Sequence, residues 1–250
     1  MAQRALKTLR PFDKSSGPVL SRAEGRQAQG LYPERGRRIK RGIFITFEGI
    51  EGCGKSTHSG LLFKYLKKSG YRVVQTREPG GTKLGEAVRK VLLNSPGIRI
   101  SDLAELFLFE ACRAQIVKDV IKPALDKGLI IISDRFSDAT FSYQGYGGRV
   151  DLGKIKTLDR VATAGVVPDL TILLDIDTAE GLRRARKKGI DRIEKKELSY
   201  HKRVRAGYLA LSKEYSGRIR RVEVSGPIPK VQAKIRSEVE VVLRKFKRPG

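Results

Sequence analysis

The chain has 250 residues, 40% of them hydrophobic, with a formal net charge of +25 and only two cysteines. This length suits one α/β domain plus an extension, and the sequence lacks both the run of about 18 apolar residues that a membrane span needs and the apolar core of a secretory signal. A disulfide framework is excluded by the cysteine count, so we expect a cytoplasmic protein with anionic partners and no membrane contact.

The first 41 residues differ in composition from the rest. They are rich in Gly, Pro, Ser, Gln and Arg, and their basic residues greatly outnumber Asp13, Glu24 and Glu34. Such a composition cannot bury much apolar surface, so residues 1–41 are predicted to form a disordered basic extension. An arm that faces RNA or a membrane, an organelle transit peptide and an extension without a role all fit this pattern, and the last is the commonest case.

From Ile43 onward, apolar runs alternate with amphipathic stretches, which is typical of β-α-β units and a parallel sheet. The expected strands are Ile43–Glu48, Tyr71–Thr76, Leu129–Ser133, Leu170–Asp175 and Ile219–Val224. The expected helices are Ser56–Ser69, Leu84–Leu93, Asp102–Leu125, Thr178–Lys188, Lys195–Tyr215 and Pro229–Phe246. Gly70 and Gly128 stand where helices should end, and Pro123 is expected to kink or end the third helix.

A phosphate-binding loop joins the first expected strand to the first expected helix. Its residues are Gly49, Ile50, Glu51, Gly52, Cys53, Gly54, Lys55, Ser56 and Thr57. The glycines let backbone N–H groups converge on phosphate oxygens, the lysine reaches the outer phosphates, and Ser56 can bind Mg²⁺. Because both flanks have the structure that the motif requires, we predict that this loop binds ATP.

Two further segments follow expected strands and should face the same crevice. Arg77 lies in the segment Thr76–Thr82, where it can clamp an anion or remain solvated beside an ordinary Pro-Gly turn. Asp134 and Arg135 follow the strand Leu129–Ser133. Asp134 could help to hold Mg²⁺ through water while Arg135 faces the transferred phosphoryl group, or the two could form a structural ion pair.

The segment Gly181–Arg205 is rich in Lys and Arg. A solvated helical face is the commoner explanation for such a run. The alternative is a closing lid whose arginines neutralise charge on the transferred phosphate.

Over Gly42–Gly250 the sequence resembles the thymidylate kinases. The resemblance depends on the order and spacing of seven blocks: Phe47–Thr57, Thr76–Thr82, Leu106–Gln115, Asp134–Phe136, Tyr143–Gly145, Pro168–Thr171 and Asp191–Glu194. The block Thr-Arg-Glu-Pro-Gly-Gly-Thr and the block Tyr-Gln-Gly are the most specific. Three positions depart from the usual family pattern, since Cys112 replaces Asp, Phe136 replaces Tyr and Ile116 replaces His.

The resemblance implies a role for particular residues. Glu51 would contact the deoxyribose 3′-hydroxyl, Phe109 would stack on thymine, and Arg113 would hydrogen-bond a thymine carbonyl. The implied substrate-binding residues are Glu51, Arg77, Phe109, Arg113, Arg135, Thr140, Tyr143 and Gln144. The implied catalytic residues are Lys55, Arg135, Arg184 and Arg186, and the implied metal site is Ser56, Asp134 and Glu194.

The phosphate loop contains no arginine, so the resemblance implies that the lid supplies the catalytic one. Arg184 and Arg186 are the first choices, with Arg183 as a substitute. Ser225–Pro229 is expected to border the adenine. The i to i+4 spacing of Phe109 and Arg113 favours a shared pocket on one helix face.

We therefore expect a three-layer α/β P-loop kinase fold with a central parallel five-stranded sheet and a helical lid over residues 183–194. The expected reaction phosphorylates thymidine monophosphate (dTMP) with Mg²⁺ and ATP, and the resemblance implies a homodimer. A kinase for another nucleotide or nucleoside is the nearest alternative. A nucleic-acid-binding P-loop ATPase is a less well supported alternative, because the sequence shows no nucleic-acid-binding motif.

Cys53 lies inside the phosphate loop, close to a helix N-terminus and Lys55. Both features favour a thiolate, so its pKa is expected to be modestly lowered, with Glu51 opposing the effect. Alkylation of Cys53 should then inactivate the enzyme, and bound ATP should protect it.

Overall fold

The computed structural model describes residues 42–94, 97–186 and 191–247. The predicted N-terminal extension, residues 1–41, and part of the predicted lid, residues 187–190, lie outside the described residues. Five strands form one sheet: β1 (Ile43–Glu48), β2 (Val73–Arg77), β3 (Ile130–Asp134), β4 (Leu170–Asp175) and β5 (Ile219–Glu223). All neighbouring pairs are parallel, in the order β2-β3-β1-β4-β5. The predicted five-stranded parallel sheet is thus confirmed.

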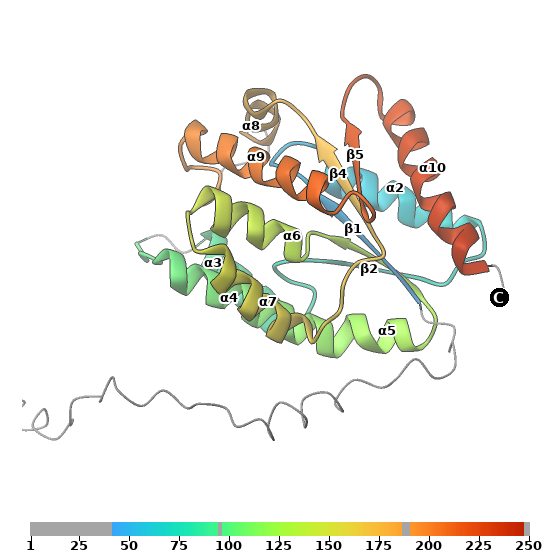
Figure 1. The fold of residues 1–250 in the computed structure, drawn as a ribbon, viewed down its shortest axis with the longest axis horizontal. Helices are drawn as coiled ribbons and strands as arrows, with labels where there is room; N and C mark the ends of the chain where they lie inside the picture. Colours follow the sequence, from blue (N-terminus) through green and yellow to red (C-terminus); the bar gives the residue numbers. More distant parts are fainter. Residues whose placement is uncertain (1–41, 95–96, 187–190, 248–250) are drawn as a thin grey trace, which may run out of the picture. The chain divides into compact units, whose positions relative to one another are not determined.

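Helices cover both faces of this sheet (Figure 1). They are α2 (Lys55–Lys68), α3 (Lys83–Asn94), α4 (Asp102–Ile116), the π-helix η2 (Val117–Ile121), α5 (Lys122–Asp126), α6 (Ser137–Thr140), the π-helix η3 (Phe141–Gly147), α7 (Leu152–Thr163), α8 (Thr178–Arg186), α9 (Leu198–Glu214) and α10 (Ile228–Lys247). Crossovers between parallel strands are right-handed, so the direction in which a connection crosses the sheet decides the face on which its helix lies. The connection from β1 to β2 runs in one direction and places α2 on one face. The connections from β2 to β3, from β3 to β4 and from β4 to β5 run in the opposite direction and place their helices on the other face. Helix α10 packs against α2.

The core follows from the alternation of side chains along the central strand β1. Ile45 and Phe47 join a cluster that contains Leu62 and Leu66 of α2, while Phe44 joins a second cluster with Ile116 and Ile121. Every residue of β1 is buried. A strand that is covered on both faces and flanked by β3 and β4 consists mainly of apolar residues, and this apolar run is the pattern that predicted it.

Two expectations about the elements need correction. The expected helix Asp102–Leu125 is divided into α4, η2 and α5 and ends at Asp126, so it does not end at Pro123. Pro123 lies just after the π-helical turn η2, where the regular hydrogen-bond ladder is already interrupted, so its missing N–H is accommodated. Helices α6, η3 and α7 were not predicted, and α9 begins at Leu198, three residues later than expected.

None of the helices in the described part of the chain is long and apolar enough to cross a membrane.

Candidate active site

The phosphate loop folds around the amine of Lys55. Gly49, Gly52 and Gly54 all have positive φ, at 135°, 69° and 91°, which residues with a side chain rarely adopt. Lys55 Nζ donates to the carbonyl oxygens of Gly49 and Ile50, at 3.0 and 2.9 Å. The lysine is therefore held at the centre of the loop, at the N-terminus of α2, as a phosphate site requires.

Helix α8 packs directly on the backbone of this loop. A Cβ atom at Gly52 would lie 1.9 Å from the carbonyl oxygen of Gly181, and a Cβ at Gly181 would lie 2.6 Å from the carbonyl oxygen of Glu51. Two glycines are thus required where the two backbones meet. The contact fixes the first turn of α8 beside the phosphate loop.

Ser56 and Asp134 lie together at the edge of the loop. The Ser56 hydroxyl donates to Asp134 Oδ2 at 2.6 Å. A hydroxyl and one carboxylate are hard oxygen ligands of the kind that Mg²⁺ uses together with water and substrate phosphates, so these residues fit that ion. Glu194, the third predicted ligand, lines the same cavity, but its carboxylate accepts the backbone N–H of Asp191 at 3.3 Å.

A cavity of about 550 Å³ extends from the phosphate loop across the carboxyl ends of the strands. Residues of the loop from Glu51 to Thr57, together with Arg77, Asp134, Arg135, Arg184 and Glu194, line it. Val224, Gly226 and Ile228 form another part of its wall, and the last two belong to Ser225–Pro229, the segment expected to border the adenine. The structure therefore brings most of the predicted ATP and metal residues to one space.

A second, smaller cavity contains the residues predicted to bind the acceptor nucleotide. Its walls include Glu51, Phe109, Arg113, Arg135, Thr140, Tyr143 and Gln144. Arg77, predicted for the same role, lies in the larger cavity and pairs with Glu86 at 3.1 Å. The two cavities meet where they share lining residues, which are Glu51, Glu78, Pro79, Arg135 and Asp191.

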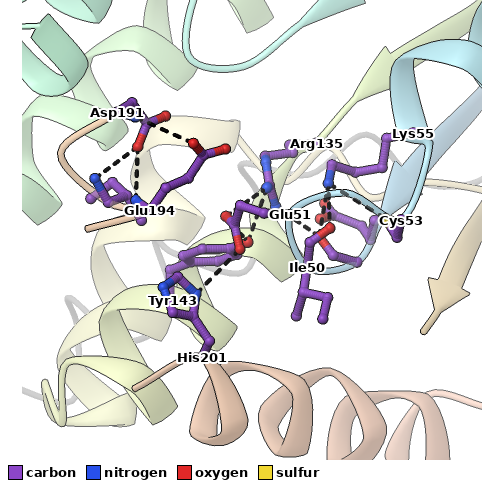
Figure 2. Close-up of polar contacts among 12 residues, drawn as sticks. Ile50, Glu51, Cys53, Lys55, Arg135, Tyr143, Asp191, Glu194 and His201 are labelled. Carbon is purple, nitrogen blue, oxygen red and sulfur yellow. Dashed lines mark hydrogen bonds and ion pairs between the residues drawn. The ribbon is translucent and has the colours of Figure 1, made fainter. Parts of the chain in front are cut away.

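Arg135 is the cation that lines both cavities in the described part of the chain, and Figure 2 shows its side chain beside Glu51. Its backbone has a φ of 73°, an uncommon value for a residue other than glycine. Its guanidinium donates to the Gly49 carbonyl oxygen and to the hydroxyls of Tyr208 and Tyr143, at 3.1, 3.1 and 3.0 Å. It also lies 3.3 Å from Glu51 Oε1 and packs over the ring of Tyr143. The side chain is thus fixed by two hydroxyls, one backbone carbonyl oxygen and one carboxylate.

Glu51 remains ionised although it is almost fully buried. Burial alone would raise its pKa, but His201, Arg135 and Lys55 together hold the pKa at about 2. The Tyr143 hydroxyl donates to Oε1, the oxygen that also faces Arg135. A fixed negative charge therefore lies between the phosphate loop and the acceptor cavity.

Arg113 is predicted to bind a thymine carbonyl, and the structure places it at the wall of the acceptor cavity with 1% of its side chain exposed. All of its guanidinium nitrogens donate to protein atoms. The acceptors are Glu78, Glu110, Thr140, Asp159 and the Phe136 carbonyl. Burial raises the pKa of Glu78 to about 7, although Arg113 opposes that shift.

The lid arginines differ in their placement. Arg184 lines the larger cavity and donates to Glu180 at 2.6 Å, while Arg183 pairs with the same glutamate at 2.7 Å. Arg186 is exposed and does not contribute to the lining of that cavity. Of the two arginines first chosen from the sequence, Arg184 therefore lies beside the phosphate loop.

Several site residues were missed by sequence analysis. Glu48 ends β1, is fully buried, and accepts the Phe136 N–H at 2.7 Å and the Tyr208 hydroxyl at 2.7 Å. Burial is the main reason that its pKa rises to about 8. An acidic residue at the end of an apolar strand, directly before the phosphate loop, was a signal that could have indicated this position. Tyr208 lies 160 residues away, and no local pattern connects the two.

The predicted direction of the Cys53 pKa was wrong, while its alkylation and protection by ATP stay predictions. Its side chain is fully buried, and burial raises the pKa of the thiol despite the nearby Lys55 and Arg135. Desolvation outweighs both the cations and the helix N-terminus. The thiol lies 3.6 Å from Lys55 Nζ but is shielded from solvent, which disfavours the thiolate form.

The parallel sheet, the phosphate loop at its carboxyl edge and the two cavities that meet at Arg135 define a P-loop phosphotransferase of the nucleotide kinase class. Comparison with known proteins gives the family. A family model described as thymidylate kinase matches residues 47–235. The chain belongs to the thymidylate kinase family.

Individual relatives agree with this assignment. The chain is 47% identical over 204 residues to a thymidylate kinase of Gloeobacter violaceus, covering 80% of this chain and 96% of the relative. It is 44% identical over 178 residues to a thymidylate kinase of Thermoanaerobacter sp. (strain X514), covering 71% and 87%. A crystal structure of thymidylate kinase from Ehrlichia chaffeensis superposes with a TM-score of 0.67 at 35% identity, covering 80% of this chain and 99% of that one.

Proposed function

We propose that this protein transfers the γ-phosphoryl group of ATP to the 5′-phosphate of dTMP, forming thymidine diphosphate and ADP. The observation that carries the proposal is the meeting of two cavities at Glu51 and Arg135, one lined by the phosphate loop and the other by Phe109, Tyr143 and Gln144. Family membership supports the choice of acceptor.

In this proposal the acceptor phosphate attacks directly, and no covalent enzyme intermediate forms. Lys55 stabilises the outer phosphates of ATP, and Arg135 binds the acceptor phosphate and the transferred group. Arg184 offsets charge that develops in the transition state. Catalysis then consists of positioning and charge neutralisation by groups that the fold already holds in place.

A magnesium ion fits the proposal because Ser56 and Asp134 present oxygen ligands beside the phosphate loop. Bound with ATP, Mg²⁺ would neutralise phosphate charge, with Ser56 and Asp134 holding it directly or through water and Glu194 supporting that side of the cavity.

On the acceptor side, Phe109 provides a stacking face, and Thr140, Tyr143 and Gln144 surround the base and sugar. Glu51 binds the deoxyribose 3′-hydroxyl. Arg77 reaches the acceptor phosphate once it leaves Glu86. Arg113 contributes to base recognition either directly, by exchanging one of its protein partners for a carbonyl, or by fixing Thr140, to which it donates at 2.9 Å.

Two further proposals concern the state of the enzyme. It acts in the cytoplasm, which cell fractionation would test. It also forms a homodimer through the surface of α3, α4 and α7, where Leu84, Leu103, Phe107 and Val161 are exposed at 46%, 50%, 51% and 76%. Helix α4 packs against both α3 and α7, so these side chains belong to neighbouring elements. Sedimentation of the wild type and of Phe107→Glu tests this surface.

The central test is a coupled assay across nucleoside monophosphates. We expect dTMP to be used at least ~10-fold better, by kcat/KM, than the uridine, cytidine, adenosine or guanosine monophosphates. Equal or better turnover of another monophosphate would overturn the thymidylate assignment. Nucleic-acid-stimulated ATP hydrolysis without phosphoryl transfer would instead favour the ATPase alternative.

A further inference from the structure

His201 occupies an unusual position for a histidine. It lies in the first turn of α9, where its backbone N–H bonds to the Glu197 carbonyl oxygen, and its side chain is fully buried. Among the described residues, neither ring nitrogen has a partner in hydrogen-bonding geometry. A buried imidazole without a partner costs stability, so a purely structural role would be better served by an apolar residue.

The carboxylate of Glu51 faces the His201 ring. His201 Nδ1 lies 3.3 Å from Glu51 Oε2, which is ion-pair distance. Oε2 is itself buried and has no hydrogen-bond partner in the described part of the chain. Figure 2 shows the imidazole approaching the carboxylate from the side opposite the phosphate loop. Two unsatisfied buried groups therefore face each other and need only a small reorientation to bond.

The other carboxylate oxygen of Glu51 is already occupied. Oε1 accepts from the Tyr143 hydroxyl and faces Arg135 at 3.3 Å. Lys55 also attracts the carboxylate, from within the phosphate loop. Oε1 thus has partners while Oε2 has none in the described part of the chain, so a donor on Oε2 is what would fix the rotation of the carboxylate.

We propose that His201 is a positioning residue, whose Nδ1–H donates to Glu51 Oε2 and orients the carboxylate that borders the donor and acceptor cavities. The proposal extends the proposed function, because Glu51 is the group that binds the acceptor sugar. His201 does not touch the nucleotide. It acts through Glu51, and its loss affects acceptor binding more than ATP binding.

A matched pair of variants separates this role from simple packing. In His201→Asn the amide nitrogen can replace Nδ1, whereas His201→Leu has the same branched shape as Asn without a donor. Leucine also favours helix and core, so the Leu variant should be at least as stable to heat as the Asn variant. We expect His201→Leu to raise KM for dTMP at least ~10-fold, with KM for ATP changed less than about threefold, and His201→Asn to stay within about threefold of wild type.

A second measurement does not depend on turnover. In protein labelled with ¹⁵N-histidine, the ring signal lost in His201→Asn identifies His201, because the chain has only two histidines. Glu51→Gln should shift that Nδ1 signal, and Glu197→Gln, a change in the same helix turn, should leave it in place.

Each outcome has a defined meaning. An unmoved Nδ1 signal in Glu51→Gln, or equal acceptor KM in the Leu variant and the wild type, overturns the inference. Equal impairment of the Asn and Leu variants also overturns it and assigns His201 to packing against Tyr200, whose ring lies 5.3 Å away. If the wild type does not phosphorylate dTMP, the proposed function is wrong. The shift of the His201 Nδ1 signal in Glu51→Gln still tests whether His201 contacts Glu51.

Discussion

Arg113 and Glu78 form an ion pair that is sealed from solvent: Nε and Nη2 of the arginine donate to one carboxylate oxygen at 3.0 and 2.8 Å, with 1% and 3% of the side chains exposed. Removing one partner of such a pair leaves an uncompensated buried charge. We expect Arg113→Leu to lower the free energy of unfolding by about 3–5 kcal/mol, as measured by urea unfolding. The exposed pair of Arg244 with Glu240 is the control, and Arg244→Ala should cost less than about 1 kcal/mol. Similar losses in both variants would contradict the prediction.

Glu48 should make the protein less stable as the pH rises. Its folded pKa, about 8, lies above its ordinary value of 4.5, so the folded state binds the proton more tightly than the unfolded chain. This stabilisation is complete below the unfolded pKa and is lost as the pH rises through about 8. One unit of pKa shift corresponds to about 1.4 kcal/mol. Between about pH 5 and pH 8, the free energy of unfolding should therefore fall by at least about 1.4 kcal/mol more in the wild type than in Glu48→Gln. Urea unfolding at both pH values tests this. Glu238→Gln, at an exposed carboxylate, should behave as the wild type.

The lid arginines should differ in their effect on turnover. Because Arg184 lines the phosphate cavity, we expect Arg184→Ala to lower kcat at least ~10²-fold while KM for dTMP changes little. Arg183→Ala is a matched control, since Arg183 pairs with the same Glu180 but is 62% exposed. Arg186→Ala should fall between them. If all three variants keep a wild-type kcat, the lid does not supply the catalytic arginine.

Both thiols should react slowly in the folded protein. Cys53 and Cys112 are fully buried, and burial raises the pKa of each, that of Cys112 to about 11. We expect a thiol-disulfide reagent at neutral pH to modify the native protein at least ~10²-fold more slowly than the urea-unfolded protein. Cys53→Ala should remain active. A fast native reaction that disappears in Cys53→Ala would show that the loop opens enough to expose the sulfur.

Glu105 should connect the acceptor cavity to the segment that precedes α9. Its buried carboxylate accepts from Gln144 Nε2 at 2.8 Å and from the guanidinium of Arg192. Glu105→Gln removes the charge that holds Arg192, so KM for dTMP should rise by roughly tenfold in steady-state kinetics. Lys196, 3.7 Å from the same carboxylate and partly exposed, is the control. A larger effect from Lys196→Ala than from Glu105→Gln would contradict the prediction.

The sequence was informative wherever function depends on a local pattern. The strand-loop-helix context of Gly49–Thr57 predicted the phosphate loop, and the apolar runs predicted all five strands within two residues at each end. Asp134 and Arg135 were predicted to lie beside the phosphates because the carboxyl ends of parallel strands meet at one edge.

What the sequence did not reveal depends on contacts between distant residues. The burial of Cys53, the saturation of Arg113 and the pairing of His201 with Glu51 each involve side chains that come together only through tertiary packing. Propensity and motif rules describe neighbours along the chain, so they gave the wrong direction for the Cys53 pKa. They also gave no indication that α6 and η3 form helices around Tyr143.

Glu51, Glu78, Pro79, Arg135 and Asp191 border both cavities, so we expect each nucleotide to affect the binding of the other. A ligand that reorders these side chains in one cavity changes the free energy of binding in the other. Thermodynamic linkage requires the effect to be reciprocal: whatever factor ATP applies to the affinity for dTMP, dTMP applies to the affinity for ATP. Any cooperativity between donor and acceptor is therefore expected to depend on this shared wall, which includes the Glu51 carboxylate and the Arg135 guanidinium.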